Sequence, residues 1–473
     1  MDKALPTDVL DYILGSIPDL YTLSSAVQVS KRLHTVYTAR QRSLRAAVAR
    51  NEAGPALPAA LRLARYQTDK KMNWQDFNWQ GLTEDSEYDI DWVMAPELRA
   101  NAAAMCELEN FYSQVFKDRT CRVSQLTVSE SRKLSRALYR LALYFERWSY
   151  DWENHLDERD WGSDDEDEEQ TDEMREWAET AASMREDQAI FLKSTASTDD
   201  ERRELCAAFI FLRDNVNPWA QTSFSTSYAT YAAPIVQMSD MRALARVLAR
   251  REHHSTPGSM LPWENPEVTR ELLRPFTLGL GLDLATVDPA LLLDEHPLND
   301  KCTQCGNLSG QKLFNESNWY LLYGYVPLRD ICILGFKSNL MRNMAEGPTI
   351  KAYFNSTSFS LPAFLRELFD SAAARGVTSA DKNAWFCMDC VKNIIESEKI
   401  TWWLDRKRAD GKTIPDDCWY GYECRTQTHK LDHAGKLNHF CRPTRGAPST
   451  SMSHTGNPQT PPPPPSTTAP ASP

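Results

Sequence analysis

The chain has 473 residues, a formal net charge of −12 at pH 7 and a hydrophobic content of 42%, and it contains 14 tryptophans. This length accommodates roughly two or three domains, each with a core of its own. The acidic balance disfavours nucleic-acid binding by charge, because phosphate contacts need a basic face. No run of apolar residues approaches the roughly 18 that a membrane-spanning helix requires.

The N-terminal segment lacks the composition of a secretory signal peptide, because four aspartates interrupt its apolar residues. These are Asp2, Asp8, Asp11 and Asp19. We therefore expect the protein to be cytoplasmic and/or nuclear. In those compartments its 11 cysteines are predicted to be reduced thiols or metal ligands and not disulfides.

Residues 5–33 carry apolar side chains at helical spacing, in short bursts that turn residues separate. Pro6 suits the first turn of a helix, and Pro18 with Asp19 is predicted to end that helix before a second begins near Tyr21. Such short helices cannot bury both faces alone, so an apolar stripe is left for a partner or for the rest of the chain. The stripe consists of Leu5, Pro6, Val9, Leu10, Ile13, Leu14, Ile17, Leu20 and Leu23.

This stretch resembles an F-box, the adaptor-binding module of cullin–RING ubiquitin ligases. The match lies in the stripe and in the step Val29-Ser30-Lys31-Arg32, although the family usually has Cys at Ser30 and an aromatic residue near Leu33. The resemblance implies that residues 1–50 dock on a Skp-family adaptor of the cullin ligase core. An ordinary helical hairpin packed on its own domain is the alternative.

Residues 51–295 are predicted to form a helical body. A strong amphipathic helix begins near Ser129, because apolar residues follow it at steps of three and four. These are Leu134, Leu138, Leu141, Phe145 and Trp148. Further helices are predicted at 42–50, 57–65, 174–191, 201–215, 239–251 and 266–274.

Two stretches within this body are predicted to be loops. Residues 74–91 combine aromatic and acidic side chains without a helical period. Residues 164–169 are all acidic, and such a block repels itself and cannot be buried. We interpret its surroundings, near 162–173, as a disordered and solvated loop, with an acidic docking segment as the alternative.

Two Cys-x-x-Cys pairs lie 81 residues apart, Cys302 with Cys305 and Cys387 with Cys390. Each pair can present two thiolates to a tetrahedral zinc ion, and two pairs complete a closed four-cysteine site, site 1. A shared site requires the intervening segment to be an insertion whose ends meet. Separate knuckles with other partners, or metal-free thiols, are the alternatives.

Residues 319–336 are rich in β-forming residues, which predicts short strands there, with Cys332 as a buried thiol. Helices are predicted at 361–374 and at about 388–406. The whole chain is therefore predicted to be mainly α, with a small α+β zinc-binding region at 296–442. Residues 443–473 are rich in Pro, Ser and Thr and are expected to form a disordered tail.

Six candidate metal ligands lie within 24 residues near the end of that region. Zinc needs four soft or borderline ligands within reach of one another, and two cysteines followed by histidines supply them. The six are Cys418, Cys424, His429, His433, His439 and Cys441.

This cluster resembles the poly(ADP-ribose)-binding type of zinc finger. The resemblance rests on the aromatic–glycine step Tyr420-Gly421 and on the spacing from His433 to His439, while the interval from Cys424 to His433 is two residues longer than in that finger. It implies a zinc site, site 2, with His429 or Cys441 as alternative fourth ligands. The ligands that it assigns are Cys418, Cys424, His433 and His439.

The same cluster and the preceding Trp402–Arg408 run resemble a C-terminal segment of F-box proteins from mushroom-forming fungi. This resemblance extends from the N-terminus to about Arg445. It implies a small C-terminal domain in which zinc binding contributes folding energy.

Catalytic motifs are absent: the chain has no Gly-rich phosphate loop, nucleophile elbow or His-Glu-x-x-His motif, so we expect no enzyme. The first functional hypothesis is a substrate receptor of an SCF-type ubiquitin ligase, which binds the adaptor through its N-terminal helices and a protein substrate through its body. The second is a zinc-finger protein outside any ligase. It would read a nucleic-acid or nucleotide-like polymer with Trp419, Tyr420, Tyr422 and nearby basic residues.

Overall fold

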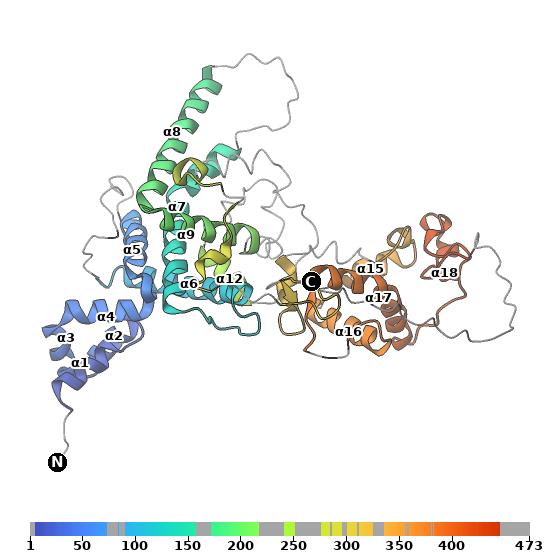
Figure 1. Ribbon diagram of the computed structural model, residues 1–473, viewed down its shortest axis with the longest axis horizontal. Helices are drawn as coiled ribbons and strands as arrows, with labels where there is room; N and C mark the ends of the chain where they lie inside the picture. Colours follow the sequence, from blue (N-terminus) through green and yellow to red (C-terminus); the bar gives the residue numbers. More distant parts are fainter. Residues whose placement is uncertain are drawn as a thin grey trace, which may run out of the picture. The chain divides into compact units, whose positions relative to one another are not determined.

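The chain forms two compact units in this computed structural model. The first unit comprises Met1–Phe336 with Pro348–Lys412, and the second comprises Lys337–Gly347 with Thr413–Pro473 (Figure 1). The described part is mainly α, as predicted, and within it strands occur in one two-stranded sheet. The structure describes residues 5–72, 84, 90–157, 172–216, 241–250, 276–283, 286–295, 300–309, 312–324, 335–354, 356, 359–379, 381 and 383–444.

Four short helices begin the first unit. The carboxylate of Asp19 caps the second helix by accepting the Thr22 N–H at 2.8 Å, and the Ser30 hydroxyl caps the third. The predicted break between the first two helices, at Pro18 and Asp19, is confirmed. The helices are α1 (Thr7–Gly15), α2 (Leu20–Val29), α3 (Lys31–Ala39) and α4 (Gln41–Ala53).

The inner face of these helices packs inside the first unit. Leu14 and Leu23 are fully buried, as is Val48 of α4, and both α2 and α4 contact α6 (Ala95–Phe116). Burial of each such side chain contributes roughly 1.5–3 kcal/mol. The N-terminal helices are thus anchored on the helical body through one face only.

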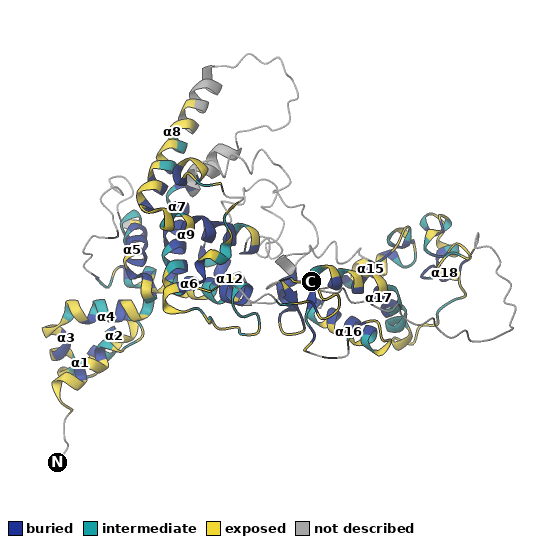
Figure 2. Cartoon of the chain, in the orientation of Figure 1, coloured by how far each residue is buried: buried dark blue, intermediate teal, exposed yellow. Residues whose placement is uncertain are grey.

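Long helices form the body, and α7 lies against α5, α6 and α9. The predicted apolar face of α7 is confirmed, since all five of its members are buried (Figure 2). Besides α6, the elements are η1 (Gly54–Ala56), α5 (Leu57–Met72), α7 (Val128–Asp157), α8 (Asp172–Thr195), α9 (Asp199–Phe211), the π-helical turn η3 (Leu212–Val216), α12 (Met241–Arg250) and η7 (Pro289–Leu292).

The sequence analysis did not predict α6, although it has 22 residues and lies in the core. Buried polar side chains interrupt its apolar period, because Asn101 and Gln114 are as inaccessible as Leu98 and Leu108. Hydrogen bonds satisfy Asn101: its amide nitrogen donates to Gln67 of α5 at 2.8 Å, and its oxygen accepts from Arg242 of α12. Tertiary partners make this polar position compatible with the core.

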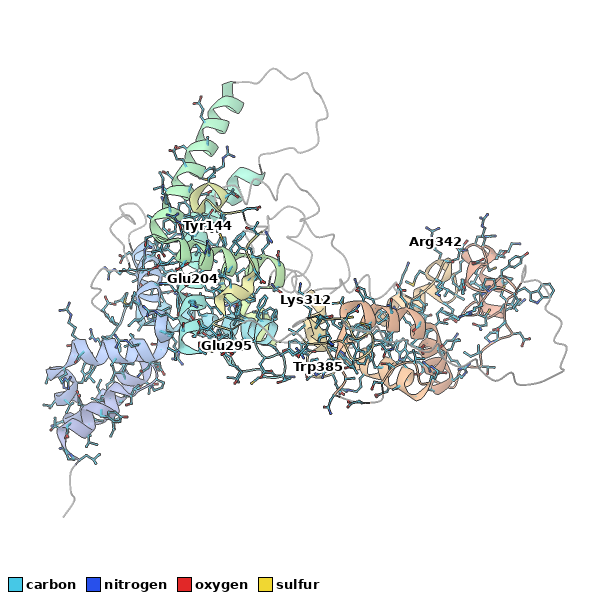
Figure 3. All side chains as sticks on the ribbon, in the orientation of Figure 1. Tyr144, Glu204, Glu295, Lys312, Arg342 and Trp385 are labelled. Carbon is cyan, nitrogen blue, oxygen red and sulfur yellow. The ribbon has the colours of Figure 1, made fainter. Side chains whose placement is uncertain are left out.

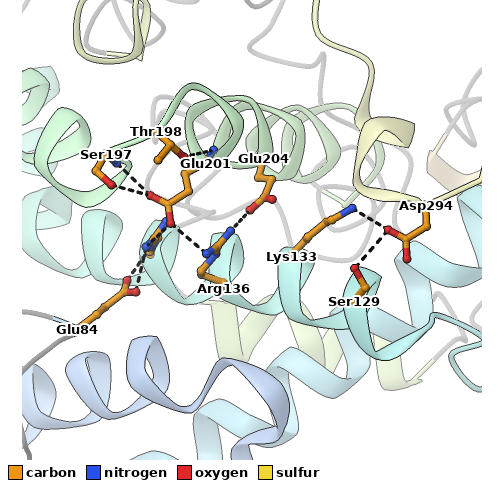
Figure 4. A network of polar contacts seen from close by, with 10 residues as sticks. Glu84, Ser129, Lys133, Arg136, Ser197, Thr198, Glu201, Glu204 and Asp294 are labelled. Atoms are coloured by element: carbon orange, nitrogen blue, oxygen red, sulfur yellow. Dashed lines mark hydrogen bonds and ion pairs between the residues drawn. The ribbon is translucent and has the colours of Figure 1, made fainter.

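A network of ion pairs joins α7 to α9 (Figure 4). Arg136 donates to Glu201 at 3.0 Å and also to Glu204, and Arg140 binds Glu84 at 2.6 Å. Glu201 also accepts hydrogen bonds from Ser197, near the start of α9. Because each carboxylate is paired with an arginine, these partly buried charges are compensated.

The strands predicted at 319–336 are wrong for the part that is described. Trp319–Gly324 is a 3₁₀ helix, η8, because a turn precedes it: Asn318 accepts the Asn315 N–H through its side chain and the Leu321 N–H through its carbonyl. These local bonds override the β preference of the aromatic residues. The sheet instead pairs β1 (Leu313–Phe314) with β2 (Phe386–Cys387) in antiparallel fashion.

Two of the remaining helices match predictions, those expected at 361–374 and at about 388–406. The helix predicted at 361–374 is found with those bounds, capped by Ser360 and followed by Gly376 at φ +73°. The others are η9 (Leu340–Arg342), α15 (Gly347–Phe354), α16 (Leu361–Ala374), α17 (Met388–Ala409), η10 (Gly421–Glu423), η11 (Thr426–Thr428) and α18 (Leu431–Lys436).

Some predictions lie outside the described residues. These concern the helix at 266–274, the acidic loop at 164–169, most of the loop at 74–91, the thiol of Cys332 and the tail from residue 445 onward. Among the described helices, none has the length and apolar character needed to cross a membrane.

Candidate metal centres

The structure brings together the four cysteines assigned to site 1. The four Sγ atoms of Cys302, Cys305, Cys387 and Cys390 all lie within 4.8 Å of one another. The Sγ atoms of Cys305 and Cys387 are 3.8 Å apart. The 81-residue segment between the pairs is therefore an insertion whose ends meet. Four sulfurs at this spacing could hold one metal ion.

Backbone hydrogen bonds hold the two Cys-x-x-Cys pairs against each other. The N–H of Thr303 donates to the Trp385 carbonyl at 2.8 Å, and the Trp385 N–H donates to the Thr303 hydroxyl at 3.0 Å. The register of the small sheet places Leu313 opposite Cys387. Gly306 turns the first pair at φ +73°, where its N–H donates to the Cys302 carbonyl.

The surroundings of Cys302 favour a thiolate. Burial opposes ionisation, but backbone N–H groups of Cys387, Cys305 and Gln304 outweigh it and lower the pKa of Cys302 to about 7. Burial raises the pKa of Cys390, and its neighbouring thiols add to this rise. A cation would remove this conflict, because it stabilises all four sulfurs as thiolates.

Site 1 is attached to the helical body through Arg119. Its guanidinium binds Asp300 at 2.6 Å and lies over the Trp385 ring, 4.3 Å from the ring centroid. Trp385 is labelled in Figure 3. Asp300 and Trp385 each lie two residues before a cysteine of the site, Cys302 and Cys387. The Arg119 side chain therefore contacts both chain segments that lead into the two cysteine pairs of site 1.

The second unit brings together the four residues assigned to site 2. Ligand atoms of Cys418, Cys424, His433 and His439 all lie within 4.8 Å of one another. Nε2 of His433 is 3.3 Å from the Cys424 sulfur and 3.8 Å from that of Cys418. These four residues could hold a second metal ion.

The imidazole of His439 supplies an independent test of whether a metal fits. Its ring is almost fully buried, and its Nε2 has no hydrogen-bond partner among the described residues. Burial lowers the pKa of His439, and nearby His433 lowers it further, which favours the neutral ring. A buried ring nitrogen without a hydrogen-bond partner is a group that a metal ion could satisfy.

Local turns present the ligands of site 2. The N–H of Cys418 donates to the Asn438 carbonyl at 2.8 Å, which joins the segment of the first cysteine to that of the last histidine. Gly421 has φ +44°, and its N–H donates to the Cys418 carbonyl. His433 projects from α18.

The two alternative ligands do not belong to this group. His429 is exposed at the surface of the second unit. The thiol of Cys441 donates to the carbonyls of Cys418 and Asn438, both at 3.4 Å, and burial raises its pKa to about 11. Cys441 is thus a protonated neighbour of the site.

The predicted apolar stripe of the N-terminal helices divides into two sets. Leu10, Leu14, Leu20 and Leu23 are buried within the first unit, while Pro6 is exposed and Ile17 is half-buried. Exposure is 50% for Leu5, 37% for Val9 and 45% for Ile13.

The stripe omitted an exposed aromatic residue of α1. Tyr12 is 77% exposed on α1. It lies three residues after Val9, so helical spacing could have identified it. We call Leu5, Val9, Tyr12 and Ile13 the α1 ridge.

Comparison with known proteins returned no relatives. No family model, no curated protein and no solved structure matches this chain.

Proposed function

We propose that this chain is a substrate receptor of an SCF-type ubiquitin ligase, with the α1 ridge as its contact to a Skp-family adaptor. The observation that carries the proposal is that both faces of α1 are apolar. The inner face, with Leu10 and Leu14, packs within the first unit, and the outer ridge faces solvent. An apolar row of this kind at helical spacing fits a groove on a partner protein.

The F-box resemblance of residues 5–33 supports this choice of partner. In this proposal the ligase chemistry belongs to other subunits, the chain contributes positioning, and the helical body or the C-terminal region binds the protein substrate.

The metal at both sites is proposed to be zinc, in a structural role. Four cysteines, or two cysteines with two histidines, are the donor sets that zinc favours in closed tetrahedral sites. All four positions are then filled by protein, which leaves none open for substrate or water. Such zinc contributes folding energy to the region around it.

The test is capture of the chain by a purified Skp-family adaptor. We expect the double variant Val9→Asp, Ile13→Asp to lose at least about tenfold in affinity, because two charges would be desolvated at an apolar interface. Titration calorimetry or surface plasmon resonance measures this loss. Variants at Leu10 or Leu14 are unsuitable, since these side chains are buried and their loss would unfold the helices.

The matched control is Val123→Asp, Ile190→Asp. Both residues are exposed β-branched side chains of the first unit outside α1, so this variant carries the same added charge. Adaptor binding by the control should equal that of wild type. Equal binding by the ridge variant would reject the receptor proposal and favour the zinc-finger hypothesis.

A further inference from the structure

Two short segments lead into the cysteine pairs of site 1, and we call them its arms. The first arm is residues 300 and 301, before Cys302, and the second is residues 385 and 386, before Cys387. The carbonyl of Asp300 in the first arm accepts the Ser309 N–H at 3.1 Å, and the second arm includes Phe386 of β2. Because each arm runs directly into a cysteine, the places of the arms decide whether the two pairs meet.

Arg119 projects toward the arms from a turn that is attached to the helical body. The turn follows α6, where the N–H of Asp118 donates to the Ser113 carbonyl at 2.8 Å. Lys117, in the same turn, pairs with Glu130 of α7, whose side chain is 1% exposed. Contacts with two long helices therefore limit the positions that the Arg119 side chain can reach.

The guanidinium of Arg119 contacts one residue of each arm. It donates to the Asp300 carboxylate at 2.6 Å, and its central carbon lies 4.3 Å from the centroid of the Trp385 ring. The Arg119 side chain is 13% exposed, so both contacts are largely shielded from water. A charge-assisted hydrogen bond and a cation–π contact thus connect both arms to one group of the body.

A second contact joins the insertion to the same end of α6. The hydroxyl of Tyr320 donates to the side-chain oxygen of Gln114, and both residues are buried. Arg122, three residues after Arg119, lies over the Tyr320 ring at 5.8 Å. The Arg119 contacts therefore belong to a packed region and are not an isolated surface pair.

We propose that Arg119 is a positioning residue of site 1, which holds both arms so that the four cysteine sulfurs converge, and which couples metal binding to the helical body. Assembling a metal site costs the conformational freedom of the segments that carry its ligands, and contacts that hold these segments beforehand reduce this cost. Such coupling is reciprocal, so a metal ion at site 1 stabilises the turn that carries Arg119. This inference rests on metal binding at site 1, which belongs to the proposed function.

The first experiment measures zinc affinity of the full-length chain by competition with a chelator. Arg119→Ala should weaken one metal equivalent at least about fivefold, the lower end of common coupling effects, and leave the other unchanged. Asp300→Asn should weaken the same equivalent. The double variant should lose less than the two single losses combined, because both changes remove one shared contact. Fully additive losses would contradict the role of that contact.

A conservative change separates the charge of Arg119 from general support of the fold. Arg119→Lys keeps a positive charge for Asp300 and Trp385, so it should bind zinc at site 1 more tightly than Arg119→Ala. Equal affinity of these two variants would count against the contacts proposed. Should Arg119→Ala fail to fold, Asp300→Asn carries the test, since it keeps the size of the side chain and removes its charge.

The matched control is Arg136→Ala. Arg136 is another shielded arginine of the first unit, bound to Glu201 and Glu204 on helices that carry no ligand of either site. This variant should hold zinc as tightly as wild type does. A zinc affinity of site 1 that is no lower in Arg119→Ala than in Arg136→Ala would refute the inference.

Hydrogen exchange of residues 117–125 tests the reciprocal effect. With zinc present, these amides should exchange more slowly in wild type than in the double variant Cys302→Ser, Cys387→Ser, which lacks site 1. In the Arg119→Ala background the same two cysteine changes should make no difference. Exchange that does not respond to site 1 in the otherwise wild-type chain would overturn the coupling. Absence of metal from site 1 of wild type would instead refute zinc binding there, so the two failures are distinguishable.

Discussion

At the scale of single residues, Gly421 allows the backbone conformation of the loop between the two cysteines of site 2. Its φ of +44° lies in the left-handed region, and a Cβ atom there would stand 2.1 Å from the Cys441 carbonyl oxygen. The sequence analysis identified this glycine as part of an aromatic–glycine step. Its structural reason is the close approach of residues 441 and 442, which only glycine permits.

We therefore expect Gly421→Ala to destabilise the second unit by at least about 1–3 kcal/mol, from backbone strain and the displaced carbonyl. Retention of zinc during a urea titration measures this effect. Gly435→Ala is the control, because a Cβ at this position of α18 would meet no atom within 4 Å. That variant should be neutral or stabilising by up to about 1 kcal/mol. Equal zinc retention by both variants would contradict the role assigned to Gly421.

At the scale of elements, a side chain of one helix accepts a hydrogen bond from a backbone N–H group at the start of another. Glu52, near the end of α4, accepts the Leu20 N–H at the start of α2 at 3.1 Å. Burial raises the pKa of Glu52 above its ordinary value of 4.5, and the Asp19 carboxylate adds to this rise, although the Leu20 N–H opposes it. Glu97 shows the reverse: burial opposes its ionisation, but Lys71 and Arg242 outweigh burial and lower its pKa.

These opposite shifts predict opposite effects of pH. The folded state binds Glu52's proton more tightly than the unfolded chain, so this residue's contribution to stability rises as pH falls from 7 toward 4.5. Glu52→Gln keeps an acceptor for Leu20 and removes the buried charge. Its free energy of unfolding should exceed that of wild type at neutral pH, and the difference should shrink on acidification.

Urea unfolding across this pH range measures the effect, with Glu97→Gln as the contrast. Because the pKa of Glu97 is lower in the folded than in the unfolded state, ionised Glu97 stabilises the fold at pH values above its unfolded-state pKa. Glu97→Gln should therefore have a lower free energy of unfolding than wild type at neutral pH, and this difference should shrink as pH falls. A Glu52→Gln variant that is less stable than wild type at pH 7 would contradict the assignment.

At the scale of the whole molecule, one insertion contributes to both compact units. Its ends carry the cysteine pairs of site 1, and its middle contains Lys337–Gly347, which belongs to the second unit. The cysteine spacing predicted that the ends of this insertion meet. The contact of Arg119 with these ends has no sequence signature, because this arginine lies 181 residues before Asp300 and belongs to no motif.

Pairing across the insertion predicts how metal content responds to single cysteine variants. Wild type should hold two zinc equivalents, one for each group of four ligands. Cys302→Ser and Cys387→Ser should each lose the same equivalent, and the double variant should still hold one. Elemental analysis of purified protein measures this, with Cys206→Ser, a buried thiol of α9, as the control that keeps both. Loss of only half an equivalent in each single variant would indicate two separate knuckles.

Sequence alone determined the mainly α class, the apolar face of α7, the bounds of α16 and the two sets of candidate metal ligands. These features depend on periodic apolar side chains or on rare residue types at fixed spacing, which a chain shows before it folds. Tertiary structure decided the existence of α6, whose buried Asn101 finds its partners on α5 and α12. It also turned the aromatic run at Trp319 into a 3₁₀ helix, separated the α1 ridge from the buried leucines and placed Arg119 against both arms of site 1. Each of these features depends on which residues, distant in the sequence, come into contact. A polar side chain is tolerated in a core only where the fold supplies hydrogen-bond partners, and an apolar side chain is buried only where the fold supplies neighbours to cover it.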